Sequence, residues 1–120
     1  MHLNHIYKLS TKKTGVKSPK LQGSIIETIL RLLTFKELSI FELTFEIQEK
    51  MPLPYRTLKK YLVYLIEYDL ISYSGKTQLY SIEYGGYDLL DKIIIEKNIA
   101  MINNEDILIT IEKDLINDPS

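Results

Sequence analysis

The chain has 120 residues, a formal net charge of −1 and no cysteine. This length suits one domain around a single core, and the lack of cysteine excludes disulfide bonds, thiol nucleophiles and thiolate metal sites. No apolar run reaches the roughly 20 residues of a membrane-spanning helix, so we expect a cytoplasmic protein without membrane contact.

Charge is distributed unevenly along the chain. Residues 1–20 contain five lysines and no acid, whereas residues 96–120 contain six acids against two lysines. Serine, threonine, glycine and proline are frequent in the basic segment. We therefore expect residues 1–22 to form a basic, irregular arm that is either solvated or in contact with nucleic acid. The lysines of the arm that are candidates for such contacts are Lys12, Lys13 and Lys17.

Two serines, each followed three residues later by a glutamate, predict the starts of two helices. The pairs are Ser24 with Glu27 and Ser39 with Glu42. In such a capping box the serine side chain accepts from the third helical amide, and the glutamate accepts from the amide of the serine. Apolar residues follow both pairs at helical spacing, so both helices are expected to pack against a common core.

A third helix is expected to begin at Pro54, where the missing proline amide would have no partner in the first turn anyway. At about 100° per residue, its leucines fall on one stripe and its basic residues on the opposite side. The stripe comprises Leu58, Leu62, Leu65 and Ile66, and the opposite side comprises Arg56, Lys59, Lys60, Val63 and Glu67. Because the acid comes near the end, the first half of this face is the part that can meet phosphates.

A tight hairpin is expected after the third helix. The β-branched and aromatic runs at 70–73 and 78–82 flank the turn sequence Ser-Gly-Lys-Thr at 74–77. In this turn Gly75 is expected to supply the positive φ. Two glycines at 85–86 then end the second strand, and a long helix is expected to follow.

Four short sequences occur along this predicted order of elements: Ser-Ile-Phe-Glu-Leu at 39–43, Leu-Pro-Tyr-Arg-Thr-Leu at 53–58, Leu-Ile at 70–71 and Tyr-Ser-Ile at 80–82. Together they resemble the winged helix-turn-helix domains of prokaryotic transcriptional regulators, most closely small archaeal or archaeal-virus regulators with a C-terminal dimerisation helix. The resemblance implies an α+β, mainly α fold. Residues 23–86 would hold three helices and a β-hairpin wing, and residues 87–120 a helical dimerisation segment.

One departure from that family lies before the first wing strand. Asp69 stands where the family usually has glycine. Aspartate tolerates left-handed backbone better than most residues, so we expect the turn to survive.

The resemblance implies sequence-specific binding of double-stranded DNA and transcriptional regulation. The implied contact residues are Tyr55, Arg56, Thr57, Lys59 and Lys60 at the major groove and Lys76 at the tip of the wing. General chemistry agrees, because a helix fits the major groove, arginine binds guanine edges and lysine neutralises phosphate. The alternative, which the near-neutral net charge favours, is a winged-helix protein-interaction module without specific DNA binding.

Nine tyrosines suggest a rival function, the stacking of single-stranded bases. Tyr61 and Tyr80 fall on the predicted core side, where tyrosine packs with a solvated hydroxyl. Tyr64 and Tyr73 are the exposed candidates for stacking.

The apolar stripe between residues 87 and 102 is wider than a single domain needs, which predicts a homodimer. The candidate interface comprises Leu90, Ile94, Ile95, Ile99 and Ile102. A two-fold dimer predicts a palindromic DNA site with half-sites about one helical turn apart. For residues 105–117 the pattern leaves both a helix and a strand open.

No catalytic or metal-binding constellation is found in the sequence. His2 and His5 have a spacing that can hold a metal on a helix, but they are the only histidines and no carboxylate is near them. We therefore expect no enzymatic activity, no cofactor and no small-molecule ligand.

Overall fold

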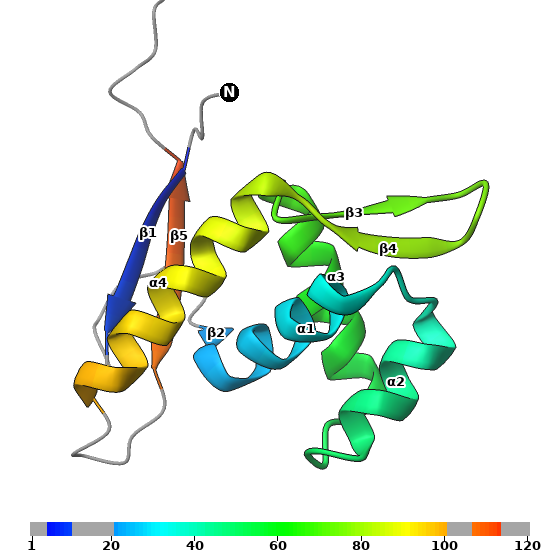
Figure 1. Cartoon of the computed structure of the whole chain (residues 1–120), viewed down its shortest axis with the longest axis horizontal. Coiled ribbons are helices and arrows are strands. Elements are labelled where there is room, and N and C mark those ends of the chain that lie inside the picture. The colour runs from blue at the N-terminus through cyan, green and yellow to red at the C-terminus, as the bar shows by residue number, and fades with distance from the viewer. Residues whose placement is uncertain (1–4, 11–20, 101–106, 114–120) are drawn as a thin grey trace, which may run out of the picture.

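A computed structural model of the chain describes residues 5–10, 21–100 and 107–113. Its main body contains the helices α1 (Gly23–Phe35), α2 (Ile40–Gln48) and α3 (Tyr55–Glu67). The hairpin strands β3 (Ile71–Ser74) and β4 (Leu79–Ile82) follow, and then α4 (Tyr84–Ala100). The predicted order of three helices, a hairpin and a further helix is confirmed, in an α+β domain that is mainly helical (Figure 1).

The core forms where the apolar stripes of the helices meet. Ile26 and Ile29 of α1 are fully buried, and Leu62 of α3 and Leu89 of α4 pack into the same cluster. Burying a side chain of this size stabilises a fold by about 1.5–3 kcal/mol. The leucine stripe predicted for α3 is therefore the side of that helix that faces the interior, and its basic residues lie outside.

The start of α2 is the capping box that the sequence predicts. The amide of Glu42 donates to Oγ of Ser39 at 3.2 Å, and the amide of Ser39 donates to Oε1 of Glu42 at 2.9 Å. The hydrogen bond from the Ser39 amide lowers the pKa of the Glu42 carboxyl. Both terminal amides are thereby satisfied, and α2 begins at a defined residue.

The capping box predicted for α1 is wrong. The helix begins at Gly23, so Ser24 already lies inside it, and the preceding Gln22 makes no side-chain cap. The reason is the strand before the helix: β2 (Leu21–Gln22) runs directly into α1, and the amide of Gly23 donates to the carbonyl of Ile107.

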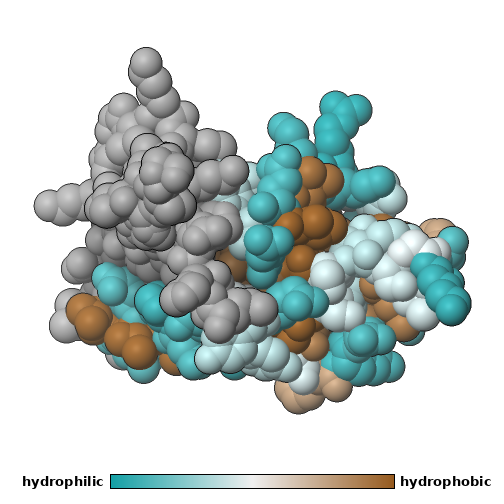
Figure 2. Space-filling model, turned by 90° about the horizontal axis from the view of Figure 1, so that it is seen from above, coloured by the Kyte–Doolittle hydropathy of each residue, from teal (hydrophilic) through white to brown (hydrophobic). Residues whose placement is uncertain are grey.

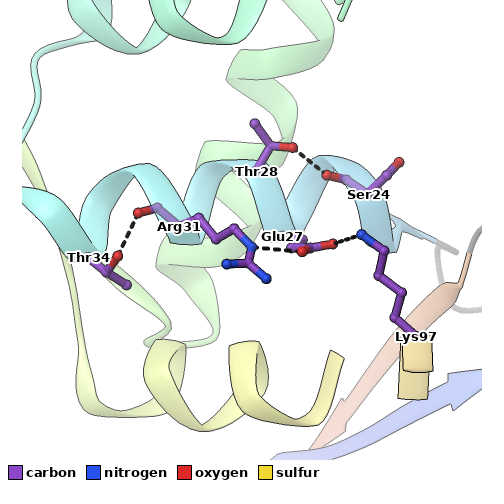
Figure 3. Close-up of polar contacts among 6 residues, drawn as sticks. All are labelled: Ser24, Glu27, Thr28, Arg31, Thr34 and Lys97. Atoms are coloured by element: carbon purple, nitrogen blue, oxygen red, sulfur yellow. Dashed lines mark hydrogen bonds and ion pairs between the residues drawn. The ribbon is translucent and has the colours of Figure 1, made fainter. Parts of the chain in front are cut away.

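Glu27 has a different function, because it joins α1 to α4 (Figure 3). Its side chain is only 9% exposed, and it accepts from Nε of Arg31 at 2.7 Å and from Nζ of Lys97 at 3.1 Å. Burial raises the pKa of this carboxyl, but the hydrogen bonds and the charges of Arg31 and Lys97 outweigh burial and lower it. Glu27 is therefore a charged, paired link between two helices that are far apart in sequence.

Two residues other than glycine take a positive φ, both at turns. Asp69 has φ 59°, the left-handed backbone that the sequence analysis expects at this turn. The positive φ in the hairpin turn lies at Gln78 (φ 61°), and the described glycines have none, so the prediction for Gly75 is wrong. The turn takes its left-handed residue directly before β4, and Gln78 donates its amide to the carbonyl of Ser74 at 2.6 Å.

The segment between α1 and α2 is held against the hairpin. Leu38 and Tyr80 form an isolated antiparallel bridge, in which each amide donates to the carbonyl of the other residue at 3.1 and 2.7 Å. This bridge fixes the hairpin on the helical body, because β4 is then hydrogen-bonded on both of its edges.

The two ends of the chain meet in a second sheet that the sequence did not predict. β1 (His5–Ser10) and β2 (Leu21–Gln22) both pair antiparallel with β5 (Leu108–Lys113), in the order β1-β5-β2. The prediction of an irregular arm over residues 1–22 is therefore wrong where β1 and β2 lie. The prediction of a helical segment over residues 87–120 is wrong where β5 lies. Of the alternatives left open for 105–117, the strand is found for β5. The physical reason is the alternation of Ile107 and Ile109, which buries both side chains on one side of the strand.

Figure 1 shows α4 as the helix that connects the hairpin with this second sheet. It begins at Tyr84, before the boundary predicted at residue 87. In the described part of the chain, no helix is long and apolar enough to cross a lipid bilayer.

Candidate nucleic-acid interface

The outer face of α3 gathers most of the predicted contact residues. Pro54 precedes the first turn in an extended conformation (φ −63°, ψ 145°) and starts the helix without a side-chain cap. One face of α3 packs against the core, and the opposite face is exposed to solvent. The exposed residues of the outer face are Tyr55, Arg56, Lys59, Lys60 and Val63. Thr57 lies at the margin and is half-buried, so the structure does not place it with the others.

These five exposed residues, which we call the α3 face, line a shallow and open hollow of about 490 Å³. Two of them are apolar or aromatic: Val63 is 54% exposed and Tyr55 is 49% exposed. Nζ of Lys59 lies 5.8 Å from the centre of the Tyr55 ring, within range of a cation–π interaction. The hollow therefore combines apolar surface with three positive charges.

The positive charges of the α3 face are not neutralised within the described part of the chain. Arg56, Lys59 and Lys60 have no ion-pair partner there, whereas Arg31, Lys92 and Lys97 each pair with an acid. The remaining charges are available to an anionic ligand.

An aromatic contact joins the two strands of the hairpin. The rings of Tyr73 and Tyr80 are 4.7 Å apart, and Tyr80 is buried while Tyr73 is 45% exposed. Burial raises the pKa of the Tyr80 hydroxyl, and the hydroxyls of Tyr73 and Tyr55 raise it further. The contact thus joins an exposed ring of β3 to a buried ring of β4.

Lys76 lies outside the hollow. It is exposed in the turn that joins β3 and β4, at the tip of a hairpin that projects from the helical body (Figure 1). The structure therefore separates the predicted cations into a cluster on α3 and a single lysine at the hairpin tip.

The two tyrosines proposed for base stacking, Tyr64 and Tyr73, differ in their exposure. Tyr73 is exposed, as expected, but the expectation for Tyr64 is wrong. Tyr64 is half-buried, and its ring packs against Tyr68 at 4.6 Å. Tyr61 is buried as expected, and its hydroxyl accepts from the amide of Gln22 at 3.0 Å. Tyr61 and Tyr64 therefore serve packing, and Tyr73 is the candidate of the two that remains open to stacking.

The residues proposed for a dimer interface fall into two groups. Leu90 is buried in the core of its own chain and is not available to a partner, and Ile94 is half-buried against that core. Ile95 and Ile99 are 60% and 67% exposed, one turn apart on α4. Ile102 and the arm lysines Lys12, Lys13 and Lys17 lie outside the described residues, as does His2.

All three phenylalanines of the chain are exposed, and none of them was predicted as a site residue. Phe41 and Phe45 of α2 are 82% and 64% exposed, and Phe35 at the end of α1 is 84% exposed. The signal was present in the sequence, because Phe41 and Phe45 stand one turn apart and out of phase with the buried Leu43 and Ile47. Seen from above, the described surface carries brown apolar patches between teal hydrophilic side chains (Figure 2).

Comparisons of the chain with protein-family models, curated protein sequences and solved structures find no match.

Proposed function

We propose that the chain binds double-stranded DNA through the α3 face and acts as a dimeric transcriptional regulator of the winged helix-turn-helix type. The observation that carries the proposal is the α3 face itself. Three cations that form no ion pair within the described part of the chain lie on the outside of a helix whose opposite side is anchored in the core. A helix held in this way is rigid enough to enter a major groove as one body.

The arrangement around α3 supports the same proposal. The hairpin would be the wing, with Lys76 placed to meet a flanking phosphate, and the bridge between Leu38 and Tyr80 would hold the wing to the helices. Asp69 with its positive φ keeps the turn between α3 and the wing tight. Glu67 is exposed at the end of α3, so the DNA contact would be confined to the first turns of the helix.

Each residue of the α3 face has a distinct expected contribution. Arg56 would bind a guanine edge through two hydrogen bonds and would carry sequence preference. Lys59 and Lys60 would neutralise phosphates and release counterions, which raises affinity for every sequence alike. Val63 would contact a thymine methyl group.

The dimer would form through α4. Ile95 and Ile99 are exposed on the outer stripe of α4, which also carries Tyr84 (69% exposed) and Tyr87 (48% exposed). An exposed stripe of two isoleucines and two tyrosines on one helix is typical of a surface that a partner covers. A two-fold axis through this stripe would present two α3 faces to a palindromic site.

The DNA-binding proposal is tested by fluorescence anisotropy with labelled duplexes at several salt concentrations. We expect duplex binding that weakens steeply with salt, and preference for duplex over single-stranded DNA of the same sequence. After selection of a preferred site from random duplexes, Arg56→Ala should relax sequence preference, and Lys60→Ala should weaken all sequences alike.

Lys92→Ala is the matched control for these variants. It removes the same charge from α4, where Lys92 pairs with Asp88 at 3.0 Å, and should leave affinity unchanged. Absence of duplex binding by the intact chain at low salt would refute the proposal.

Light scattering tests the dimer. Ile95→Asp combined with Ile99→Asp should convert a dimer into a monomer, because two buried charges without partners would be placed in the interface. Phe35→Asp places a charge at an exposed apolar position outside α4 and serves as the control. An unchanged mass for the isoleucine variant would place the interface elsewhere.

A further inference from the structure

The outward side of α2 is both aromatic and acidic. Phe41 and Phe45 are exposed one turn apart, and glutamates lie around them. The helix α2 itself contains no lysine or arginine. We call this surface the α2 face; it comprises Phe41, Glu42, Phe45, Glu46 and Glu49. Its glutamates would repel the phosphates of DNA, so DNA is not the ligand of this face.

Two phenylalanines exposed one turn apart form an apolar patch, and such patches mark contact surfaces, whereas a single exposed apolar side chain does not. Figure 1 shows α2 at the periphery of the molecule, with its outer side directed away from the other elements. Burial in the fold of the same copy therefore does not explain the two phenylalanines.

The α3 face has the complementary character. Three cations, Arg56, Lys59 and Lys60, stand around the apolar surface of Tyr55 and Val63. The α2 face offers three carboxylates around two phenyl rings. The acids of one face would meet the cations of the other, while apolar side chains meet apolar side chains in the hollow of about 490 Å³.

We propose that the α2 face of one copy docks in the hollow of the α3 face of a second copy. Among the described residues the hollow is lined by α3 alone, so it does not hold the α2 face of its own copy. The contact joins two different surfaces, which makes it heterologous, so it either repeats along a chain of copies or closes into a ring.

The consequence for regulation rests on the proposed function. A copy whose α3 face is covered by the α2 face of a neighbour cannot place that face on DNA. Self-association and DNA binding are then mutually exclusive, and DNA releases the associated copies. A contact between two single helix faces is smaller than a standard stable interface, so the association is weak and appears at high protein concentration and low salt.

The experiment uses two full-length variants, each of which lacks one of the two faces. Phe41→Ser with Phe45→Ser removes the apolar part of the α2 face and keeps the α3 face. Lys59→Glu with Lys60→Glu reverses the α3 face and keeps the α2 face. Both carry Ile95→Asp and Ile99→Asp, so that the stripe on α4 does not contribute. Circular dichroism first confirms that each variant is folded.

Sedimentation equilibrium then gives the outcome. We expect the parent with only the α4 substitutions to associate, each face variant alone to associate at least about tenfold more weakly, and an equimolar mixture of the two to form a one-to-one complex that salt dissociates. Phe35→Ser removes an equally exposed phenylalanine outside both faces and should leave association unchanged. No complex in the mixture, or undiminished association of either variant alone, overturns the proposal and leaves the α2 face to a different protein.

DNA binding separates this inference from the proposed function. At protein concentrations that support self-association, Phe41→Ser with Phe45→Ser should bind duplex DNA at least as tightly as the parent, whereas Lys59→Glu with Lys60→Glu should lose DNA binding. A mixed complex without any duplex binding by the parent would refute DNA recognition alone. Duplex binding without a mixed complex would refute the self-association alone.

Discussion

Gly86, in the first turn of α4, lies where that helix passes closest to the start of the hairpin. A Cβ atom at this position would overlap the carbonyl oxygen of Leu70 and would meet the side chain of Ile82 at 2.7 Å. Backbone cannot move aside as a flexible side chain can. We expect Gly86→Ala to lower the free energy of unfolding by about 1–3 kcal/mol, although alanine favours a helix by about 1 kcal/mol.

Urea unfolding measures this effect, and Gly75→Ala is its control. Nothing lies within 4 Å of a Cβ atom at Gly75, and its φ is not positive. That variant should stay within about 0.5 kcal/mol of the parent. Equal effects of the two substitutions would contradict the close approach of α4 to Leu70.

Glu27 makes the stability of the domain depend on acidic pH. Its pKa is lowered below the ordinary 4.5 in the folded protein, since the bonds to Arg31 and Lys97 outweigh burial. The stabilisation is therefore complete above the ordinary value and is lost as the pH falls through 4.5 toward the lowered pKa. We expect Glu27→Gln to cost about 1 kcal/mol at pH 7, a modest value because both cations are more than half exposed, and to remove part of the acid dependence.

Thermal unfolding between pH 7 and pH 3 measures that dependence. Asp88→Asn is the matched control, because Asp88 forms the same i,i+4 kind of pair with Lys92 at the surface. A surface pair of this kind contributes under about 0.5 kcal/mol. Parallel pH profiles for the parent and Glu27→Gln would show that Glu27 does not stabilise the fold as a charged group.

At the scale of elements, α2 depends on its capping box. Ser39→Ala removes the acceptor of the Glu42 amide and should cost about 1 kcal/mol of stability, because a helix amide is left without a partner. Glu42→Gln keeps an acceptor for the Ser39 amide and should have a much smaller effect. Chemical unfolding of both variants distinguishes them, and an equal loss would mean that the charge of Glu42, rather than the cap, stabilises α2.

The helices and the hairpin could be predicted because their signals are local. The stripe of Leu58, Leu62 and Leu65 and the box at Ser39 are each read within a few residues. The same kind of signal failed at Ser24, because β2 pairs with a strand more than eighty residues away and moves the helix start to Gly23. Pairing between chain ends has no local signature, so the sheet β1-β5-β2 was out of reach.

The candidate site divides in the same way. Helical periodicity placed Arg56, Lys59 and Lys60 on one outward face correctly, since an anchored opposite side fixes the phase of the helix. Periodicity alone did not place Thr57, which is half-buried at the margin. It assigned Leu90 to a dimer interface, although Leu90 is buried in the core of its own chain. The burial of residues at the edge of a helix face depends on which neighbouring element covers them, and the sequence of the helix alone does not contain that information.

At the scale of the whole molecule, a net charge of −1 means that long-range attraction does not bring the chain to DNA. Binding then depends on a local excess of cations on one side. Acids on α2 and unpaired cations on α3 create that separation between two helices in sequence order. The same separation gives one copy two surfaces of opposite charge, which links recognition of DNA with association between copies.

The number of phosphates that the molecule meets can be counted from the salt dependence of binding. If Arg56 contacts a base and Lys59, Lys60 and Lys76 contact phosphates, each protomer neutralises about three phosphates and releases their counterions. The slope of log affinity against log salt should then be about −3 for one protomer and about −5 to −6 for a dimer. Lys76→Ala should reduce the slope by about 1 per protomer, because the tip of the hairpin would no longer reach a phosphate. Lys92→Ala should leave it unchanged. A dimer that binds with the slope of a single protomer would show that only one α3 face touches DNA, and the two-fold arrangement through α4 would then be wrong.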